Sequence, residues 1–543
     1  IMFFEDEAFD KFRMSKEETQ LFEEIEKEET KAADTDKPDR EKKKKNVAKD
    51  DKDKKEESKP TPLQFDLVNA KDRIMRLTIN SSSLGDAVLT PDGEKLYYIA
   101  SFEGGGDLWE RNFKENSTKL IIKGVGFGSL NMDKDGKNIY MASNGQLKKI
   151  ETAGNKVTNI SYNAPFKARP AETRDYIFDH AWQQVADKFY VTDIHGIDWG
   201  GYKKDYAKFL PHINNNYDFA EMLSELLGEL NASHTGARFG GSGATLQTAT
   251  LGAFYDNSYN GDGLVIKEIL KKGPLDKANS KIKNGMIIEK IDGTPILKNT
   301  NFYPLLAGKS GKLTLLSIYD PASGKRFDEQ VKPFSYGQEN GLLYDRWVEQ
   351  RRALVDKLSN GKLGYVHVKG MDSESFRKTY SELLGRCRNK EGVIVDTRHN
   401  GGGWLHDDLV TLLSGKEYQQ FAPRGQYIGS DPYNKWLKKS AVLVCEDNYS
   451  NAHGFPFVYQ QLGVGKLIGT PVPGTMTAVW WEPQIDPSIV FGIPQVAVKD
   501  MEGNYLENKE LQPDILVYNS PEEELQGIDK QLEEAVKHLL KTN

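Results

Sequence analysis

The sequence Asp447-Asn-Tyr-Ser-Asn-Ala-His-Gly-Phe-Pro456 joins a predicted strand to a predicted helix. Ala441–Cys445 is a continuous apolar run typical of a buried strand, and Phe455–Leu462 has helical character. Pro456 suits the first turn of that helix, where a missing N–H costs nothing. A strand, a tight turn and a helix N-terminus expose a nucleophile beneath free N–H groups, although an ordinary strand–helix connection has the same pattern.

Three other segments of the sequence carry residues that could form a catalytic site together with this turn. Residues 396–403, Asp-Thr-Arg-His-Asn-Gly-Gly-Gly, follow a second predicted buried strand, Gly392–Asp396. Ser233-His234 follows an amphipathic helix, and Leu506-Glu-Asn508 lies near the C-terminal end. This ordered set resembles the tricorn and C-terminal-processing serine peptidases of family S41. The resemblance covers roughly residues 60–540 and is strongest from 360 to 515.

The resemblance implies a Ser-His-Ser-Glu tetrad for amide hydrolysis. His234 would be the general base, with Glu507 orienting it through Ser233. In the family pattern the nucleophile is the second serine of a Ser-x-Ser-Asp/Glu turn. That turn reads Ser450-Asn-Ala-His453 here, so Ala452 occupies the predicted nucleophile position.

An oxyanion hole is implied by the same resemblance. Gly402 and the N–H of His453 are the predicted donors, with Gly401 and Gly403 as alternatives one position away. The nearby Asp396 and Arg398 are predicted to tie the turn together structurally.

Alanine cannot attack a carbonyl, so three explanations compete for Ala452. We favour an engineered Ser-to-Ala change, which leaves the chain inactive and holds substrate uncleaved, because every other tetrad member is retained. A natural pseudoenzyme that binds or scaffolds peptides is the second explanation. The third is that Ser450 is the nucleophile and the register is two residues off. We disfavour it because Ser450 falls on the strand side of the turn, away from the predicted helix.

Composition narrows the class of protein. A net charge of −7 gives no electrostatic footprint for nucleic acid, and no apolar run approaches the ~18 residues that would span a bilayer. The nine histidines show no paired metal-ligand spacing; His406-Asp-Asp408 suits a helix start, and Cys387 and Cys445 suit burial as small apolar groups. We therefore predict no metal and no cofactor. The chain starts at Ile1 without a visible targeting segment, so we expect a fragment. Its compartment stays open between the bacterial periplasm, which we slightly favour, and the cytoplasm.

The predicted fold is multidomain: β-propeller-like blades, a small helical bundle, a PDZ-like β-rich domain and an α/β core with a mainly parallel sheet. Thr90-Pro-Asp-Gly recurs as Asp133-Lys-Asp-Gly 43 residues later, which indicates blades. The predicted limits are 1–30 for a strand and a helix of the preceding propeller region, 31–60 for a charged linker, 61–165 for blades, 166–248 for the helical domain with Ser-His, 249–338 for the PDZ-like domain and 339–543 for the peptidase core.

Details within these regions are also predicted. Asp218 caps the helix that leads to Ser233, and the core strands are Leu363–Val368, Val393–Asp396, Ala441–Cys445, Leu467–Gly469 and Ile489–Val498. In the PDZ-like region, Leu251, Gly252, Ala253 and Phe254 form either a loop that takes a peptide's C-terminal carboxylate or a strand leading into the domain. The expected partners are peptides or unfolded proteins and, as in tricorn-like relatives, further copies of the chain in a homo-oligomer.

Overall fold

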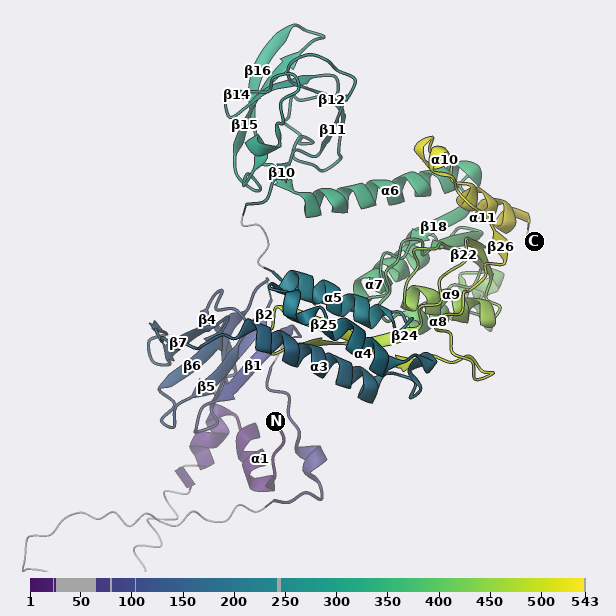
Figure 1. The fold of residues 1–543 in the computed structure, drawn as a ribbon. Coiled ribbons are helices and arrows are strands. Elements are labelled where there is room, and N and C mark those ends of the chain that lie inside the picture. Colours follow the sequence, from purple (N-terminus) through teal and green to yellow (C-terminus); the bar gives the residue numbers. More distant parts are fainter. Residues whose placement is uncertain (23, 26–64, 79–80, 103, 242–245, 542–543) are drawn as a thin grey trace, which may run out of the picture. The chain divides into compact units, whose positions relative to one another are not determined.

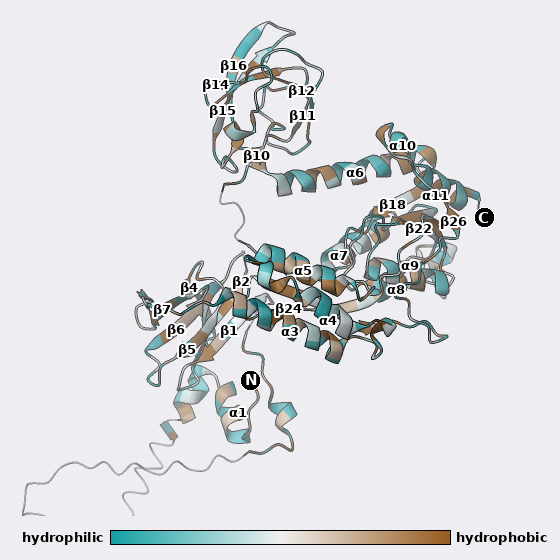
Figure 2. Ribbon diagram, viewed as in Figure 1, coloured by the Kyte–Doolittle hydropathy of each residue, from teal (hydrophilic) through white to brown (hydrophobic). Residues whose placement is uncertain are grey.

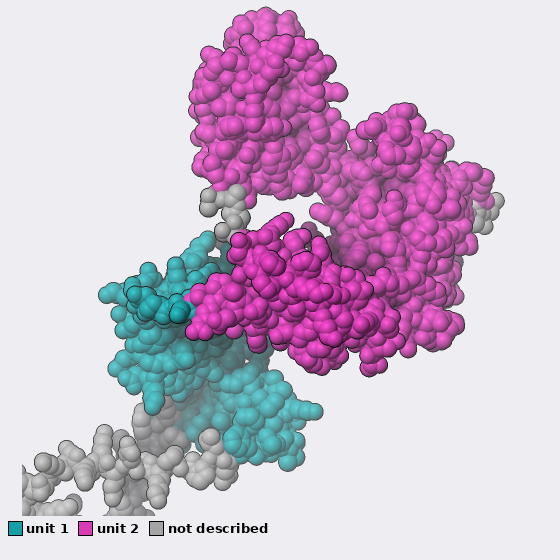
Figure 3. All heavy atoms as spheres, viewed as in Figure 1, with its two compact units in different colours: residues 1–167 teal, residues 168–543 magenta. Residues whose placement is uncertain are grey.

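The computed structural model describes residues 1–22, 24–25, 65–78, 81–102, 104–241 and 246–541 (Figure 1). The chain forms two compact units, residues 1–167 and residues 168–543, coloured separately in Figure 3. The whole of the predicted charged linker, 31–60, lies outside the described residues. The other predicted domain limits stay predictions.

The first unit consists mainly of two four-stranded antiparallel sheets. The two Asp-Gly repeats occupy equivalent places, each joining the first and second strands of its sheet. Alternating side chains fill the core, including Tyr97, Ile99, Ile139 and Met141. The sheets are β1 (Ser83–Leu89), β2 (Lys95–Ser101), β3 (Asp107–Asn112) and β4 (Ser117–Ile122), then β5 (Ser129–Met132), β6 (Asn138–Ser143), β7 (Gln146–Glu151) and β8 (Val157–Ile160).

The start of this unit differs in detail from expectation. Within residues 1–30 the predicted strand is only an isolated bridge between Met2 and Ile74, and helix α1 (Asp6–Arg13) follows it. The Ser15–Glu18 capping box is present, with Ser15 N–H donating to the Glu18 carboxylate and Glu18 N–H donating to Ser15 Oγ. A short 3₁₀ turn, η1 (Ala70–Arg73), precedes β1.

The second unit begins with a helical region that carries Ser233 and His234. Its helices are α3 (Pro170–Lys188), α4 (Trp199–Ala207) and α5 (Asn216–Gly228), with 3₁₀ turns η2 (Ile194–Gly196) and η3 (Leu210–His212). The predicted apolar face of α5 is buried, including Phe219, Leu223 and Leu226. Asp218 does not cap this helix. Asn215 does, because its side chain accepts from the Asp218 N–H, so the helix begins earlier than predicted.

A β-rich region follows, and it contains an antiparallel sheet in the order β11-β12-β13-β15-β16, with β14 pairing with β13. Leu251 is fully buried in its core beside Ile266 and Ile288. The strands are β10 (Ala249–Thr250), β11 (Ala253–Tyr255), β12 (Leu264–Ile269), β13 (Ile287–Ile291), β14 (Thr294–Pro295), β15 (Thr314–Asp320), β16 (Lys325–Val331) and β17 (Phe334–Ser335), with η4 (Tyr303–Leu306).

The long helix α6 (Tyr336–Leu358) leads from there to a five-stranded parallel sheet, β18-β19-β22-β23-β26. Hydrophilic and hydrophobic residues alternate along α6 in Figure 2, as expected of a helix with one face in a core. The sheet strands are β18 (Leu363–His367), β19 (Gly392–Asp396), β22 (Lys439–Val444), β23 (Lys466–Gly469) and β26 (Ile515–Leu516).

Helices cover both faces of this sheet, as its uniformly apolar strands require. Residues of α8 (His406–Leu413) and α9 (Asn451–Gln461) share one core with Val395 and Val442. Residues of α6 and α11 (Lys530–Lys541) share the other with Ile394 and Leu443. The remaining elements are α7 (Ser373–Ser381), η5 (Glu382–Arg386), β20 (Gln419–Phe421), η6 (Pro423–Gly425), β21 (Gly429–Asp431) and α10 (Pro521–Leu525).

One predicted core strand belongs elsewhere. The segment 489–498 forms β25 (Ile489–Ala497) of an antiparallel sheet with β24 (Thr477–Pro483) and β9 (Gly236–Phe239), while β26 supplies the fifth parallel strand. The apolar side chains of β25 pack against the helical region instead, through Ile489, Phe491 and Ile493. This pairing matters for the site because β9 directly follows Ser233-His234.

Candidate active site

The turn after β22 places Ser450 at the N-cap of α9. Its backbone has φ 57° and ψ −124°, a combination that is strained for a residue with a side chain. Helix α9 begins at Asn451, four residues before the predicted start at Phe455. Ser450, which is half-buried, therefore sits at the helix N-terminus and not on the strand side of the turn.

Pro456 lies inside α9, so its predicted place in the first turn is wrong. A proline there would normally orphan the carbonyl four residues earlier. That carbonyl belongs to Ala452, and it accepts a hydrogen bond from Asn448 Nδ2 at 3.1 Å. Asn448 also donates to Thr397 Oγ1 at 3.0 Å and accepts from the Cys445 N–H at 3.3 Å. This buried asparagine replaces the missing helical donor, which allows the helix to start earlier than the sequence indicates.

The earlier helix start changes the position of two predicted site residues. Ala452 is fully buried in the core with Phe455 and Val442, and its N–H donates to the Tyr449 carbonyl. The His453 N–H donates to the Ser450 carbonyl at 2.8 Å, so it is not free to serve an oxyanion. Burial lowers the pKa of the His453 imidazole to about 4. The geometry thus argues against Ala452 as the position that faces a base and against His453 as a donor.

Ser233, His234 and Glu507 come together in one hydrogen-bonded cluster. Ser233 Oγ lies 2.8 Å from His234 Nδ1 and donates to Glu507 Oε2 at 3.0 Å. The Ser233 N–H donates to the other carboxylate oxygen of Glu507. Burial lowers the pKa of His234 and raises that of Glu507, although hydrogen bonds from Ser233 partly oppose the latter. A neutral imidazole backed by a hydroxyl and a carboxylate is a competent proton acceptor.

Tyr449 and β24 connect this cluster to the turn at Ser450. The Tyr449 hydroxyl accepts the His234 N–H at 2.7 Å, and the two rings are 4.7 Å apart. Thr475 Oγ1 accepts the Ser450 N–H at 2.8 Å, and Thr477 Oγ1 lies 3.0 Å from His234 Nδ1. Sequence reasoning missed these three side chains. The two threonines have the i, i+2 spacing of one strand face, which was the only available signal.

The glycine turn after β19 packs against the same serine. Gly402 has φ 96°, and a Cβ added there would stand 2.6 Å from Ser450 Cβ and 2.7 Å from the Tyr449 carbonyl oxygen. Only glycine fits so close an approach. The Gly402 N–H donates to Asn400 Oδ1 at 2.9 Å. Asn451 opens α9, and within the described part of the chain no acceptor is assigned to its N–H.

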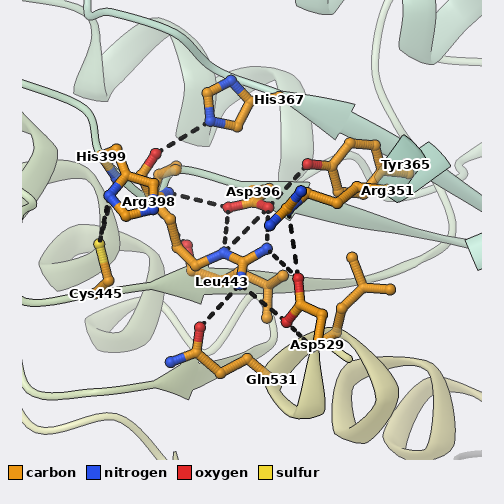
Figure 4. Close-up of polar contacts among 12 residues, drawn as sticks. Arg351, Tyr365, His367, Asp396, Arg398, His399, Leu443, Cys445, Asp529 and Gln531 are labelled. Carbon is orange, nitrogen blue, oxygen red and sulfur yellow. Dashed lines mark hydrogen bonds and ion pairs between the residues drawn. The ribbon is translucent and has the colours of Figure 1, made fainter. Parts of the chain in front are cut away.

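A buried ionic network anchors the start of this glycine turn, as Figure 4 shows. Arg398 lies between Asp396 and Asp529, with Arg398 Nη2 2.7 Å and 3.0 Å from their carboxylates. Burial raises the pKa of Asp396, but the paired guanidinium outweighs it and holds that pKa at about 2. The structural role predicted for Asp396 and Arg398 agrees with these contacts.

Of residues 251–254, predicted as a carboxylate loop or an entry strand, Ala253 and Phe254 lie in β11, whereas Leu251 and Gly252 link β10 to β11. Leu251 and Gly252 are buried, and Ala253 begins β11, which pairs with β12. Phe254 is partly exposed beneath the Arg346 guanidinium. A role of these four residues in binding a peptide's C-terminal carboxylate stays a prediction.

Comparison with known proteins gives two family matches and several relatives. Residues 362–517 match peptidase family S41, and residues 170–228 match the tricorn protease C1 domain. Tricorn protease homolog 1 of Streptomyces coelicolor is 26% identical over 74% of this chain and 39% of its own length. The tricorn protease of Thermoplasma acidophilum is 26% identical over 67% of this chain and 34% of its own length. The chain thus spans less than half the length of these relatives.

A solved structure has the same fold. The crystal structure of the tricorn protease superposes with a TM-score of 0.75 at 20% identity, covering 89% of this chain and 49% of that one. Among the described residues, no helix combines the length and apolarity that a bilayer crossing requires. The chain thus contains a region that matches peptidase family S41 and a region that matches the tricorn protease C1 domain, and it is similar over about two thirds or more of its length to these tricorn proteases.

Proposed function

We propose that this chain is a serine peptidase of the tricorn type in which Ser450, and not Ala452, attacks the peptide carbonyl. The observation that carries the proposal is the backbone of Ser450, held at φ 57° and ψ −124° where α9 begins. A strained residue between a strand and a helix N-terminus holds its hydroxyl clear of the chain, as a nucleophile requires. Ala452 lies two residues further on, where its methyl faces the core.

His234 takes the proton of the Ser450 hydroxyl through Nε2, because its Nδ1 already faces Ser233 and Thr477. Ser233 passes a hydrogen bond from the imidazole to Glu507, whose charge stabilises the imidazolium as it forms. The same imidazolium then protonates the leaving amine. Tyr449 fixes the backbone of His234 and so the position of the ring.

The oxyanion of the tetrahedral intermediate needs donors beside Ser450. The Asn451 N–H is the first, since it is the leading N–H of α9 and lies next to the nucleophile. The second comes from the 401–403 glycine turn. The Gly402 N–H already donates to Asn400, so a neighbouring N–H of that turn takes the role predicted for Gly402.

Peptides or unfolded chains are the substrates we propose, and the β-rich region is the place where they dock. It has the strand order of a small antiparallel sheet whose outer strand, β11, pairs only with β12 among the described residues. An extended peptide can add to such an edge. This supports the PDZ-like assignment and also a second candidate function, a peptide-binding scaffold without hydrolysis. The two four-stranded sheets of the first unit support propeller-like blades, and a homo-oligomer remains part of the proposal.

A fluorophosphonate probe, which reacts with activated serines, tests the assignment. We expect the probe to label Ser450, as located by peptide mapping, and casein and fluorogenic peptides to be cleaved. Ser450→Ala should lose both signals, with turnover down on the order of a millionfold. The matched variant Ala452→Ser should keep both.

Two results would count against the proposal. Activity that appears only in Ala452→Ser would restore alanine to the nucleophile position. Labelling and cleavage that are absent from the unmodified chain would leave the scaffold function.

A further inference from the structure

A cluster of three unlike side chains lies at the carboxyl ends of two neighbouring strands, outside the tetrad. His399 follows β19, while Cys445 and Asp447 follow β22. The ligating atoms of these three residues all lie within 4.8 Å of one another. His399 Nδ1 stands 2.8 Å from Asp447 Oδ2 and 3.9 Å from Cys445 Sγ, and Figure 4 shows the ring nitrogen facing the sulfur.

We propose that His399, Cys445 and Asp447 form a binding site for one thiophilic divalent cation, with Zn²⁺ the preferred ion. Imidazole, thiolate and carboxylate are the three ligand types that Zn²⁺ takes in proteins. Around tetrahedral Zn²⁺ such ligand atoms stand about 3.3–3.6 Å apart, given bonds of about 2.0–2.3 Å. The two separations that involve His399 bracket that value, and the Asp447–Cys445 separation lies within 4.8 Å, so side-chain rotations bring all three to bonding distance, with the fourth position left to water.

The surroundings of the cluster favour a preorganised metal site over an accidental grouping of three side chains. Cys445 is 4% exposed, whereas His399 and Asp447 are exposed, so an ion can enter from solvent and meet a fixed sulfur. The His399 N–H donates to Cys445 Sγ at 3.3 Å, which fixes the two loops against each other. The ring of Trp347 stands edge-on to His399 at 6.0 Å and limits where the imidazole can go.

An ordinary reading of the same contacts is a surface His399–Asp447 ion pair beside a buried thiol. The two readings differ in the role of sulfur. A pair of this kind needs no thiolate, whereas the cation site does. The site also has a consequence that the pair lacks. One bound ion would connect two loops: the loop that leads to Asn400 and the glycine turn, and the loop that leads to Ser450.

Co²⁺ serves as the probe for Zn²⁺, because a cobalt–thiolate bond gives an intense near-ultraviolet charge-transfer band. The full chain, free of any histidine tag, is titrated with Co²⁺ at pH 8, where protons compete least with the ion. We expect one saturable Co²⁺ per chain, the charge-transfer band, and its loss when Zn²⁺ is added. Cys445→Ala should remove the band, and His399→Gln or Asp447→Asn should weaken binding by about tenfold or more.

Cys387→Ala is the matched control, since Cys387 is the other buried thiol and lies outside the cluster. It should keep the band and the affinity. Circular dichroism checks that each variant is folded, and all the readouts are independent of peptidase activity. Absence of saturable binding overturns the proposal. So does binding without the band, or a band that persists in Cys445→Ala.

Discussion

Replacing Asn448 by alanine is the sharpest test of how the turn at Ser450 is held. Asn448 is 1% exposed and donates to the Ala452 carbonyl and to Thr397 Oγ1, while its own Oδ1 accepts from the Cys445 N–H. In Asn448→Ala the Ala452 carbonyl has no donor left, because Pro456 carries no N–H. The Cys445 N–H loses its acceptor as well.

The magnitude follows from these orphaned groups. Each buried polar group without a partner costs about 1–3 kcal/mol, so two of them cost about 2–6 kcal/mol of local stability. Ser450 occupies the N-cap position of the helix that this asparagine stabilises, so the proposed peptidase turnover should fall along with stability. Gln460→Ala, which removes an exposed contact from the same helix, should stay within about 0.5 kcal/mol of the unmodified chain.

Pro456→Ala provides the decisive partner variant. It restores an N–H that can donate to the Ala452 carbonyl, so Asn448→Ala should cost about 1 kcal/mol less in that background. Hydrogen exchange of the α9 amides measures the effect locally, which a chain of several domains requires. Strictly additive losses in the double variant would refute the idea that the asparagine substitutes for the missing helical donor.

Three further outcomes are expected. Burial lowers the pKa of His234 below its ordinary 6.5 and the base must be neutral, so kcat/KM should be full above pH 6.5 and fall on the acid side with a midpoint below that value; a midpoint above 6.5 would contradict this. Arg398→Leu strands the buried Asp396 carboxylate and should cost about 3–5 kcal/mol in urea unfolding of the second unit, whereas a loss under about 1 kcal/mol would show that the pair is dispensable. Asn215→Ala should cost about 1 kcal/mol by thermal melting and Asp218→Ala less, since only the asparagine caps α5; the reverse order would restore the cap predicted from sequence.

The parallel sheet could be predicted from sequence because its strands are buried on both faces and read as unbroken apolar runs. Four of its five strands follow from that signal. The fifth, β26, pairs over only two residues, too short a run to stand out, whereas the longer β25 has the right pattern but packs on the helical region. The apolar pattern of β25 predicts that the strand is buried, but it does not show which of the hydrophobic cores the strand packs into.

The start of α9 could not be predicted from the sequence. The late predicted start is the reason why the sequence prediction places Ser450 on the strand side of the turn and prefers Ala452 as the nucleophile position. Gly454 and Pro456 are residues that usually end or precede helices, so the turn seemed to extend to Phe455. Asn448, which lies outside the helix, donates to the carbonyl that Pro456 leaves without a helical donor. No pattern in the neighbouring sequence predicts this hydrogen bond. The cation cluster was equally invisible, because His399 and Cys445 are 46 residues apart and meet only through the register of β19 beside β22.

The contact between Ser233 and Glu507 joins residues 274 positions apart. A chain emerging from the ribosome therefore carries Ser233 and His234 well before Glu507 has been translated. Until residue 507 exists and has docked, the hydrogen-bonded cluster around His234 is incomplete. The geometry of this cluster thus depends on late steps of synthesis and folding.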